Sequence, residues 1–122
     1  MAVMMFLERE VLHMAMSKTV MGKRFKYRGS LTKGIYVDFH DPGADWFIPV
    51  EIIEIIKSEI AQRSPVRMGA SRRPLVKDSV GETLYREHEF SPAAMTYVLP
   101  LLVEAGYCTI DPKRPFLITI TR

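Results

Sequence analysis

The chain has 122 residues and a mass of 14.0 kDa, which is the size of one domain and leaves no room for two full hydrophobic cores. Hydrophobic residues make up 48% of the chain and charged residues 25%, a composition that excludes disordered, collagen-like and coiled-coil proteins. The longest uncharged apolar run, residues 92–103, is too short for a bilayer-spanning helix, so we expect no membrane partner. A single cysteine, Cys108, allows no intrachain disulfide and favours a cytoplasmic location.

The charged residues are segregated along the chain, although the net charge of +3 is small. Five basic residues and no acidic residue lie between Lys23 and Lys33, and the same holds between Arg63 and Lys77. The stretch 41–59 between these clusters contains five acidic residues and one lysine. A basic stripe of this kind binds phosphates in a salt-dependent way, whereas most charge runs form only a solvated surface. Both interpretations of the two basic clusters stay open at this point.

Apolar residues at spacings of three and four, including Met4, Leu7, Val11 and Met14, mark the N-terminal segment. This period predicts an amphipathic helix over residues 1–21. Six of the eight methionines fall in this segment, and their flexible thioether side chains fit irregular neighbours, either in a core or on a partner. We expect the helix to pack against its own copy in a homodimer.

From residue 23 the hydrophobic period changes to two. Basic residues alternate with aromatic residues there, in the order Arg24, Phe25, Lys26, Tyr27 and Arg28. After a turn bounded by glycines, residues 35–39 alternate in the same way. The pattern predicts a β-hairpin over residues 23–40 with a basic outer face, followed by an Asp-Pro-Gly loop.

Isoleucines at helical spacing follow Pro49, a residue that is tolerated at the first position of a helix. We therefore predict a helix from Pro49 to about Gln62. Residues 64–78 contain two prolines and a glycine without a clear hydrophobic period, so we predict a basic loop there.

Two strong helix starts follow in quick succession. Ser79 and Glu82 fit a capping box, which predicts a short helix over residues 79–88. A Ser-Pro pair at 91–92 predicts a second helix, which ends at Gly106. A terminal hairpin is predicted after it, because β-branched residues flank a turn bounded by prolines.

The run from Ser79 to Ile110 resembles the winged helix-turn-helix superfamily. A short helix, a Ser-initiated second helix with Leu99 and Leu102, and a Glu-Ala-Gly-Tyr segment lead into a β-wing. The resemblance covers about residues 49–122 of a chain that we expect to be a single domain. It implies an α+β fold, namely a winged helix-turn-helix core with an N-terminal helix and an additional basic β-hairpin. In this family the second helix usually enters the major groove, while the wing contacts phosphate or the minor groove.

The resemblance implies a DNA-binding protein, either a transcriptional regulator or a sequence-tolerant accessory factor, with double-stranded DNA and a second copy of the chain as partners. The outward side of the second helix departs from the family pattern. It lacks the Arg, Lys, Asn and Gln that read base edges, because its stripe consists of Ala93, Thr96, Tyr97, Pro100 and Glu104. We therefore expect contacts that position the protein on the phosphate backbone without specifying sequence.

The candidate nucleic-acid-binding residues belong to the basic hairpin, the basic loop, the start of the second helix and the wing tip. They are Arg24, Lys26, Arg28, Arg72, Arg73, Lys77, Ser91, Thr96, Tyr97, Lys113 and Arg114. The apolar stripe of the second helix also supports an alternative function. In that alternative the chain is a protein–protein interaction module, a complex subunit or an inhibitor, that uses the fold without base readout.

The densest ionisable cluster consists of Asp38, His40, Asp41 and Asp45, where a carboxylate-oriented imidazole is geometrically possible. The Asp-Pro-Gly sequence is first a turn signal, and no second histidine lies at metal-ligand spacing. The chain also lacks phosphate-loop, zincin, hydrolase and CxxC motifs. We therefore predict no enzyme, with no catalytic residue, no metal and no cofactor, and we expect Cys108 to be a buried, unreactive residue.

Overall fold

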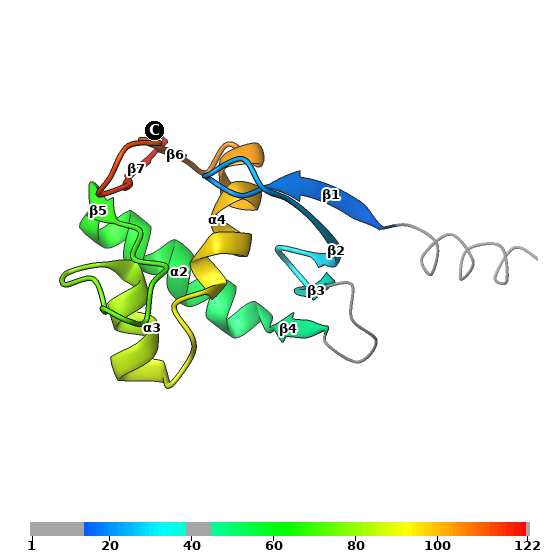
Figure 1. The fold of residues 1–122 in the computed structure, drawn as a ribbon, viewed down its shortest axis with the longest axis horizontal. Coiled ribbons are helices and arrows are strands. Elements are labelled where there is room, and N and C mark those ends of the chain that lie inside the picture. Colours follow the sequence, from blue (N-terminus) through cyan, green and yellow to red (C-terminus); the bar gives the residue numbers. More distant parts are fainter. Residues whose placement is uncertain (1–13, 39–44, 122) are drawn as a thin grey trace, which may run out of the picture.

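The computed structural model describes residues 14–38 and 45–121. Within these residues the fold is α+β, with an N-terminal four-stranded antiparallel sheet, three helices and a small three-stranded sheet (Figure 1). Helix α4 (Ala94–Glu104) lies between the two sheets and contacts both of them. No helix in the described ranges is long and apolar enough to cross a membrane.

The N-terminal sheet consists of β1 (Ala15–Lys18), β2 (Arg24–Ser30), β3 (Gly34–Asp38) and β4 (Trp46–Ile48), in this spatial order. β2 and β3 pair antiparallel and form the hairpin that the period of two predicts. Phe25, Ile35 and Val37 point into the core, and the basic side chains that alternate with them on β2 are exposed. One face of this sheet is therefore apolar and the other is basic.

The prediction of an N-terminal helix over residues 1–21 is wrong where the structure can be compared with it. Residues 15–18 form β1, which pairs with β2 in the register Ala15↔Tyr27 to Lys18↔Arg24. The helical spacing of the methionines was a local signal, and the open edge of the hairpin provides backbone hydrogen bonds that local periodicity does not reveal. Residues 1–13, and with them the dimer contact expected from that helix, lie outside the described residues.

Helices α2 (Val50–Arg63) and α3 (Val80–His88) lie where the sequence predicted them. Helix α2 begins at Val50, one residue later than predicted, because Pro49 has an extended backbone and is the N-cap. Ser79 caps α3, because its hydroxyl oxygen accepts a hydrogen bond from the Glu82 amide at 3.0 Å. The Glu82 carboxylate accepts from the amide of Asp78, one residue before the cap, and this bond lowers the pKa of Glu82.

Helix α4 begins two residues later than the Ser-Pro signal indicated, at Ala94 instead of Pro92. Residues 91–93 form a tighter turn, in which the Ala94 amide donates to the carbonyl of Ser91 at 3.1 Å. The helix then continues through Pro100, which is buried inside it. The buried residues of α4 include Met95 and Leu99, which are completely covered.

The small sheet consists of β5 (Val66–Arg67), β6 (Cys108–Ile110) and β7 (Leu117–Ile120), in the order β5-β7-β6. β6 and β7 form the predicted terminal hairpin. β5 lies in the segment that the sequence presented as a loop, and it pairs with β7 through Val66↔Ile118. A further backbone hydrogen bond joins the same segments, in which the Met68 amide donates to the carbonyl of Phe116 at 3.1 Å. The basic loop is therefore anchored directly beside the terminal hairpin.

Candidate nucleic-acid interface

The N-terminal sheet covers the side of α4 that we expected to face outward. The ring of Tyr97 packs edge-on against Phe25 with centroids 5.1 Å apart, and against Trp46 at 6.1 Å. Pro100 is buried, and the Glu104 carboxylate accepts a hydrogen bond of 2.7 Å from Ser17 on β1. Tyr97 and Glu104 of the stripe therefore contact the N-terminal sheet instead of presenting a free recognition surface.

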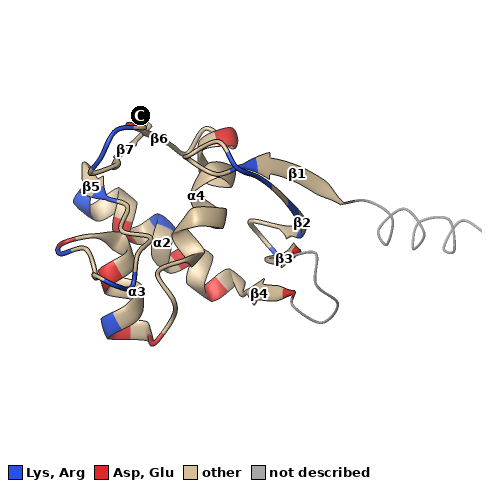
Figure 2. Ribbon diagram, in the orientation of Figure 1, with Lys and Arg blue, Asp and Glu red and all other residues tan. Residues whose placement is uncertain are grey.

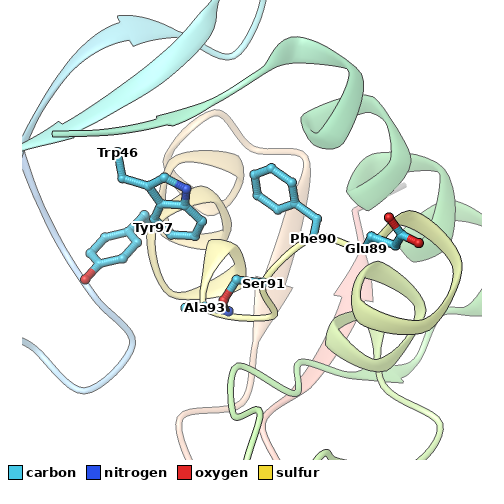
Figure 3. Close-up of a pocket in the computed structure, with 6 residues that line it drawn as sticks. All are labelled: Trp46, Glu89, Phe90, Ser91, Ala93 and Tyr97. Carbon is cyan, nitrogen blue, oxygen red and sulfur yellow. Dashed lines mark hydrogen bonds between the residues drawn. The ribbon is translucent and has the colours of Figure 1, made fainter.

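An open aromatic pocket lies at the start of α4, next to β4 (Figure 3). It has a volume of about 480 Å³ and is lined by Trp46, Glu89, Phe90, Ser91, Ala93 and Tyr97. Trp46 stacks on Phe90 with centroids 5.7 Å apart, and Figure 3 shows the indole between Tyr97 and Phe90. Burial raises the pKa of Tyr97. The pocket brings two predicted contact residues together, but it offers aromatic surface and one carboxylate instead of cations for phosphate.

Five of the predicted cations form what we call the loop–hairpin surface. They are Arg72, Arg73 and Lys77 of the loop after β5, and Lys113 and Arg114 of the β6–β7 turn. All five are exposed, and none forms an ion pair with an acidic residue of the described part of the chain. Lys77 lies near Glu82 and contributes to lowering the pKa of that carboxyl, and Arg72 lines a shallow hollow with Arg86 and Glu89 at the end of α3.

The packing around the loop–hairpin surface gives it a defined shape. Ser71 and Arg114 line one cavity of about 410 Å³, together with Thr96 of α4. A backbone bridge between Arg72 and Leu75 shapes the loop itself. Thr96 of α4 thus lies next to this basic surface, and its role as a contact residue stays a prediction.

The cations of β2 belong to a different surface. Arg24, Lys26 and Arg28 lie on the exposed face of the N-terminal sheet, and Figure 2 shows β2 and the β6–β7 hairpin on opposite sides of α4. Arg28 forms an ion pair of 3.7 Å with Asp45 and lies over the ring of Tyr36 at 4.9 Å. The single basic stripe that the charge pattern suggested is therefore divided between two surfaces.

The ionisable cluster around Asp38 and Asp45 falls only partly within the structure, since His40 and Asp41 lie outside the described residues. The described part of the chain holds no group of three or more acidic, histidine or cysteine side chains placed to bind a metal. Cys108 is 1% exposed, and burial raises the pKa of its thiol to about 11. The thiol is therefore protonated and unreactive at neutral pH.

Sequence reasoning missed an exposed aromatic pair. Tyr36 of β3 and Phe47 of β4 lie side by side on the outer face of the N-terminal sheet, with ring centroids 4.5 Å apart. The alternation of residues 35–39 indicated that Tyr36 faces outward. Its neighbour could not be identified, because β4 has three residues and gives no periodic signal of its own.

No family model matches the chain, and neither a curated protein nor a solved structure shows significant similarity to it. The function must therefore be inferred from the charges and the geometry described above.

Proposed function

We propose that the protein binds double-stranded DNA through its phosphate backbone and acts as a sequence-tolerant accessory factor. The observation that carries this proposal is the loop–hairpin surface, where five exposed cations lack ion-pair partners among the described acidic residues. Cations placed in this way release the counterions of DNA when they bind, and this release drives association without regard to sequence.

The order of elements supports a winged helix-turn-helix arrangement of the C-terminal part of the chain. Helices α3 and α4 are joined by a short turn that Glu89 enters with a positive φ of 52°. The β6–β7 hairpin follows α4 directly and carries Lys113 and Arg114 in its turn. In winged helix-turn-helix proteins this hairpin is the wing, and it contacts phosphate or the minor groove.

The covering of α4 argues for backbone contacts over base readout. A recognition helix must enter the major groove, but the N-terminal sheet packs against Tyr97 and Glu104 on the side of α4 that would do so. Phosphate contacts fix the position of a protein on DNA and carry no sequence information directly. An accessory factor therefore fits the geometry better than a transcriptional regulator that reads an operator by α4.

The double variant Lys113→Ala/Arg114→Ala is expected to lower duplex affinity at least about tenfold and to reduce the salt slope by about 2, one unit for each lost phosphate contact. Fluorescence anisotropy of a labelled non-specific duplex at several salt concentrations measures both quantities. The matched control is Arg24→Ala/Lys26→Ala, which removes the same charge from the sheet on the other side of α4. Equal affinities of the two double variants would remove the hairpin turn from the proposal.

One observation favours a second candidate function, a protein–protein interaction module. The cavity beside Thr96 is lined mainly by apolar side chains, including Val20, Met68 and Phe116, and Met21 at its rim is 75% exposed. An apolar hollow next to an exposed methionine is suited to a protein partner. The duplex titration separates the two candidate functions. A protein–protein interaction module is expected to show no affinity for the duplex at any salt concentration, whereas the DNA-binding protein binds it at low salt.

A further inference from the structure

The exposed face of the N-terminal sheet combines basic and aromatic side chains in two adjacent zones. The face presents Lys18 from β1, Arg24, Lys26 and Arg28 from β2, Tyr36 from β3 and Phe47 from β4. The register places Lys18 opposite Arg24, and Tyr36 between Arg28 and Phe47. Cations thus gather on the β1–β2 side and aromatic rings on the β3–β4 side.

The aromatic zone is exposed and held in place. Tyr36 is 42% exposed and Phe47 is 40% exposed, although most large apolar side chains of the described residues are buried. The two rings contact each other, and the Arg28 guanidinium lies over the ring of Tyr36. The same guanidinium forms an ion pair with Asp45. The guanidinium covers one face of Tyr36, so bases would stack on the outer side of the row formed by Arg28, Tyr36 and Phe47, since aromatic rings and guanidinium planes both stack on bases.

The basic zone places two cations directly opposite each other. Lys18 and Arg24 lie directly across from each other, and like charges at such positions destabilise a sheet. Neither side chain forms an ion pair with an acidic residue in the described ranges. A bound phosphate backbone would offset this repulsion.

Three acidic side chains of the described residues lie near this face. Asp38 is opposite Lys26, and Asp45 pairs with Arg28, so both belong to the β3–β4 side. Glu104 lines a shallow hollow with Lys18 and Arg24, and its carboxylate is bonded to the buried Ser17. Along β1 and β2, the cations Lys18, Arg24 and Lys26 therefore exceed the nearby carboxylates of Asp38 and Glu104 by one charge, beside the aromatic pair.

We infer that this face binds single-stranded nucleic acid, with bases stacked on Tyr36 and Phe47 and phosphates held by Lys18, Arg24 and Lys26. Unpaired bases are required, since the bases of a duplex are already stacked inside it and cannot reach the rings. The face lies on the other side of α4 from the β6–β7 hairpin, so this inference does not rest on the proposed duplex binding.

The test is fluorescence anisotropy with labelled oligo(dT) and oligo(U) of about ten nucleotides, within the length range that single-strand-binding folds occupy. Tyr36→Ala/Phe47→Ala is expected to weaken binding by at least about tenfold, while Tyr36→Phe keeps the ring and is expected to bind like the unaltered protein. Arg24→Ala/Lys26→Ala is expected to weaken binding and to lower its salt slope. Tyr36→Leu, which keeps apolar bulk without an aromatic ring, replaces the double aromatic variant if circular dichroism shows that the latter is unfolded.

The controls separate this inference from the proposed function. Lys113→Ala/Arg114→Ala is expected to weaken oligonucleotide binding less than Arg24→Ala/Lys26→Ala does, and to weaken duplex binding more than that variant does. Binding of either oligonucleotide with the expected variant pattern supports the inference, and a preference between them shows whether the face favours thymidine-containing DNA or uridine-containing RNA. It is overturned if the folded protein binds neither oligonucleotide at low salt, or if removing the aromatic rings leaves the affinity unchanged.

Discussion

Gly81→Ala is expected to destabilise the protein by at least about 3 kcal/mol, although alanine is the better helix former by about 1 kcal/mol. Gly81 is the second residue of α3 and is buried. A Cβ atom there would overlap the carbonyl oxygen of Gly69 and approach its carbonyl carbon to 2.7 Å. The Gly81 amide also donates to the carbonyl of Met68 at 3.1 Å, which fixes the two backbones against each other. The clash is with backbone, so no flexible side chain can move aside to relieve it.

Urea unfolding followed by circular dichroism measures this loss. Ser58→Ala on the exposed side of α2 is the control, and we expect it to change stability by no more than about 0.5 kcal/mol. A Gly81→Ala protein as stable as the control would contradict the close approach of α3 to the segment after β5. That approach matters for function, because the same segment continues into the loop that carries Arg72 and Arg73.

Phe25→Ala is expected to cost about 3 kcal/mol, the lower end of the range for removing a buried phenylalanine side chain. Phe25 is 6% exposed and packs on Tyr97, so it joins the N-terminal sheet to α4. The residues before and after Phe25, Arg24 and Lys26, are exposed cations on the opposite face of β2, so the substitution removes a contact of the inner face only. The variant therefore tests whether the sheet covers α4.

Tyr36→Ala is the matched control for this prediction, because it removes an aromatic ring from the opposite face of the same sheet. We expect it to cost only about 1 kcal/mol, the value of its contact with Phe47. The single tryptophan, Trp46, also contacts Tyr97, so its fluorescence reports the same junction and is expected to change in Phe25→Ala. Equal losses of stability in both variants, with unchanged fluorescence, would show that the sheet is not docked on α4.

The elements with a repeated local pattern were predictable from the sequence. The isoleucines of α2, the capping box of α3 and the alternation of β2 and β3 each encode their structure within a few residues. Short strands such as β4 and β5 were not predictable, because a strand of two or three residues exists only through a partner far away in the sequence. β1 shows the same limit, since residues 15–18 pair with β2 where the apolar spacing of the N-terminal segment predicted a helix.

The candidate site was predictable as a set of residues but not as a surface. The sequence indicated which cations cluster, and it showed that the outer stripe of α4 is unsuited to reading bases. It could not show that β1 and β2 contact this stripe, nor that β2 and the β6–β7 hairpin lie on opposite sides of α4. Tyr36 and Phe47 come together only through the pairing of β3 with β4. Each of these facts depends on contacts between segments distant in the chain.

The central claim is that the loop–hairpin surface binds the DNA backbone, and a salt titration of the unaltered protein with a labelled non-specific duplex tests it most directly. Contact with about four phosphates predicts that a fourfold rise in salt, from about 50 to 200 mM, lowers the affinity by roughly two orders of magnitude. Anisotropy at the two salt concentrations measures this change. Absence of binding at the lower concentration by folded protein, or an affinity that does not depend on salt, would contradict the claim.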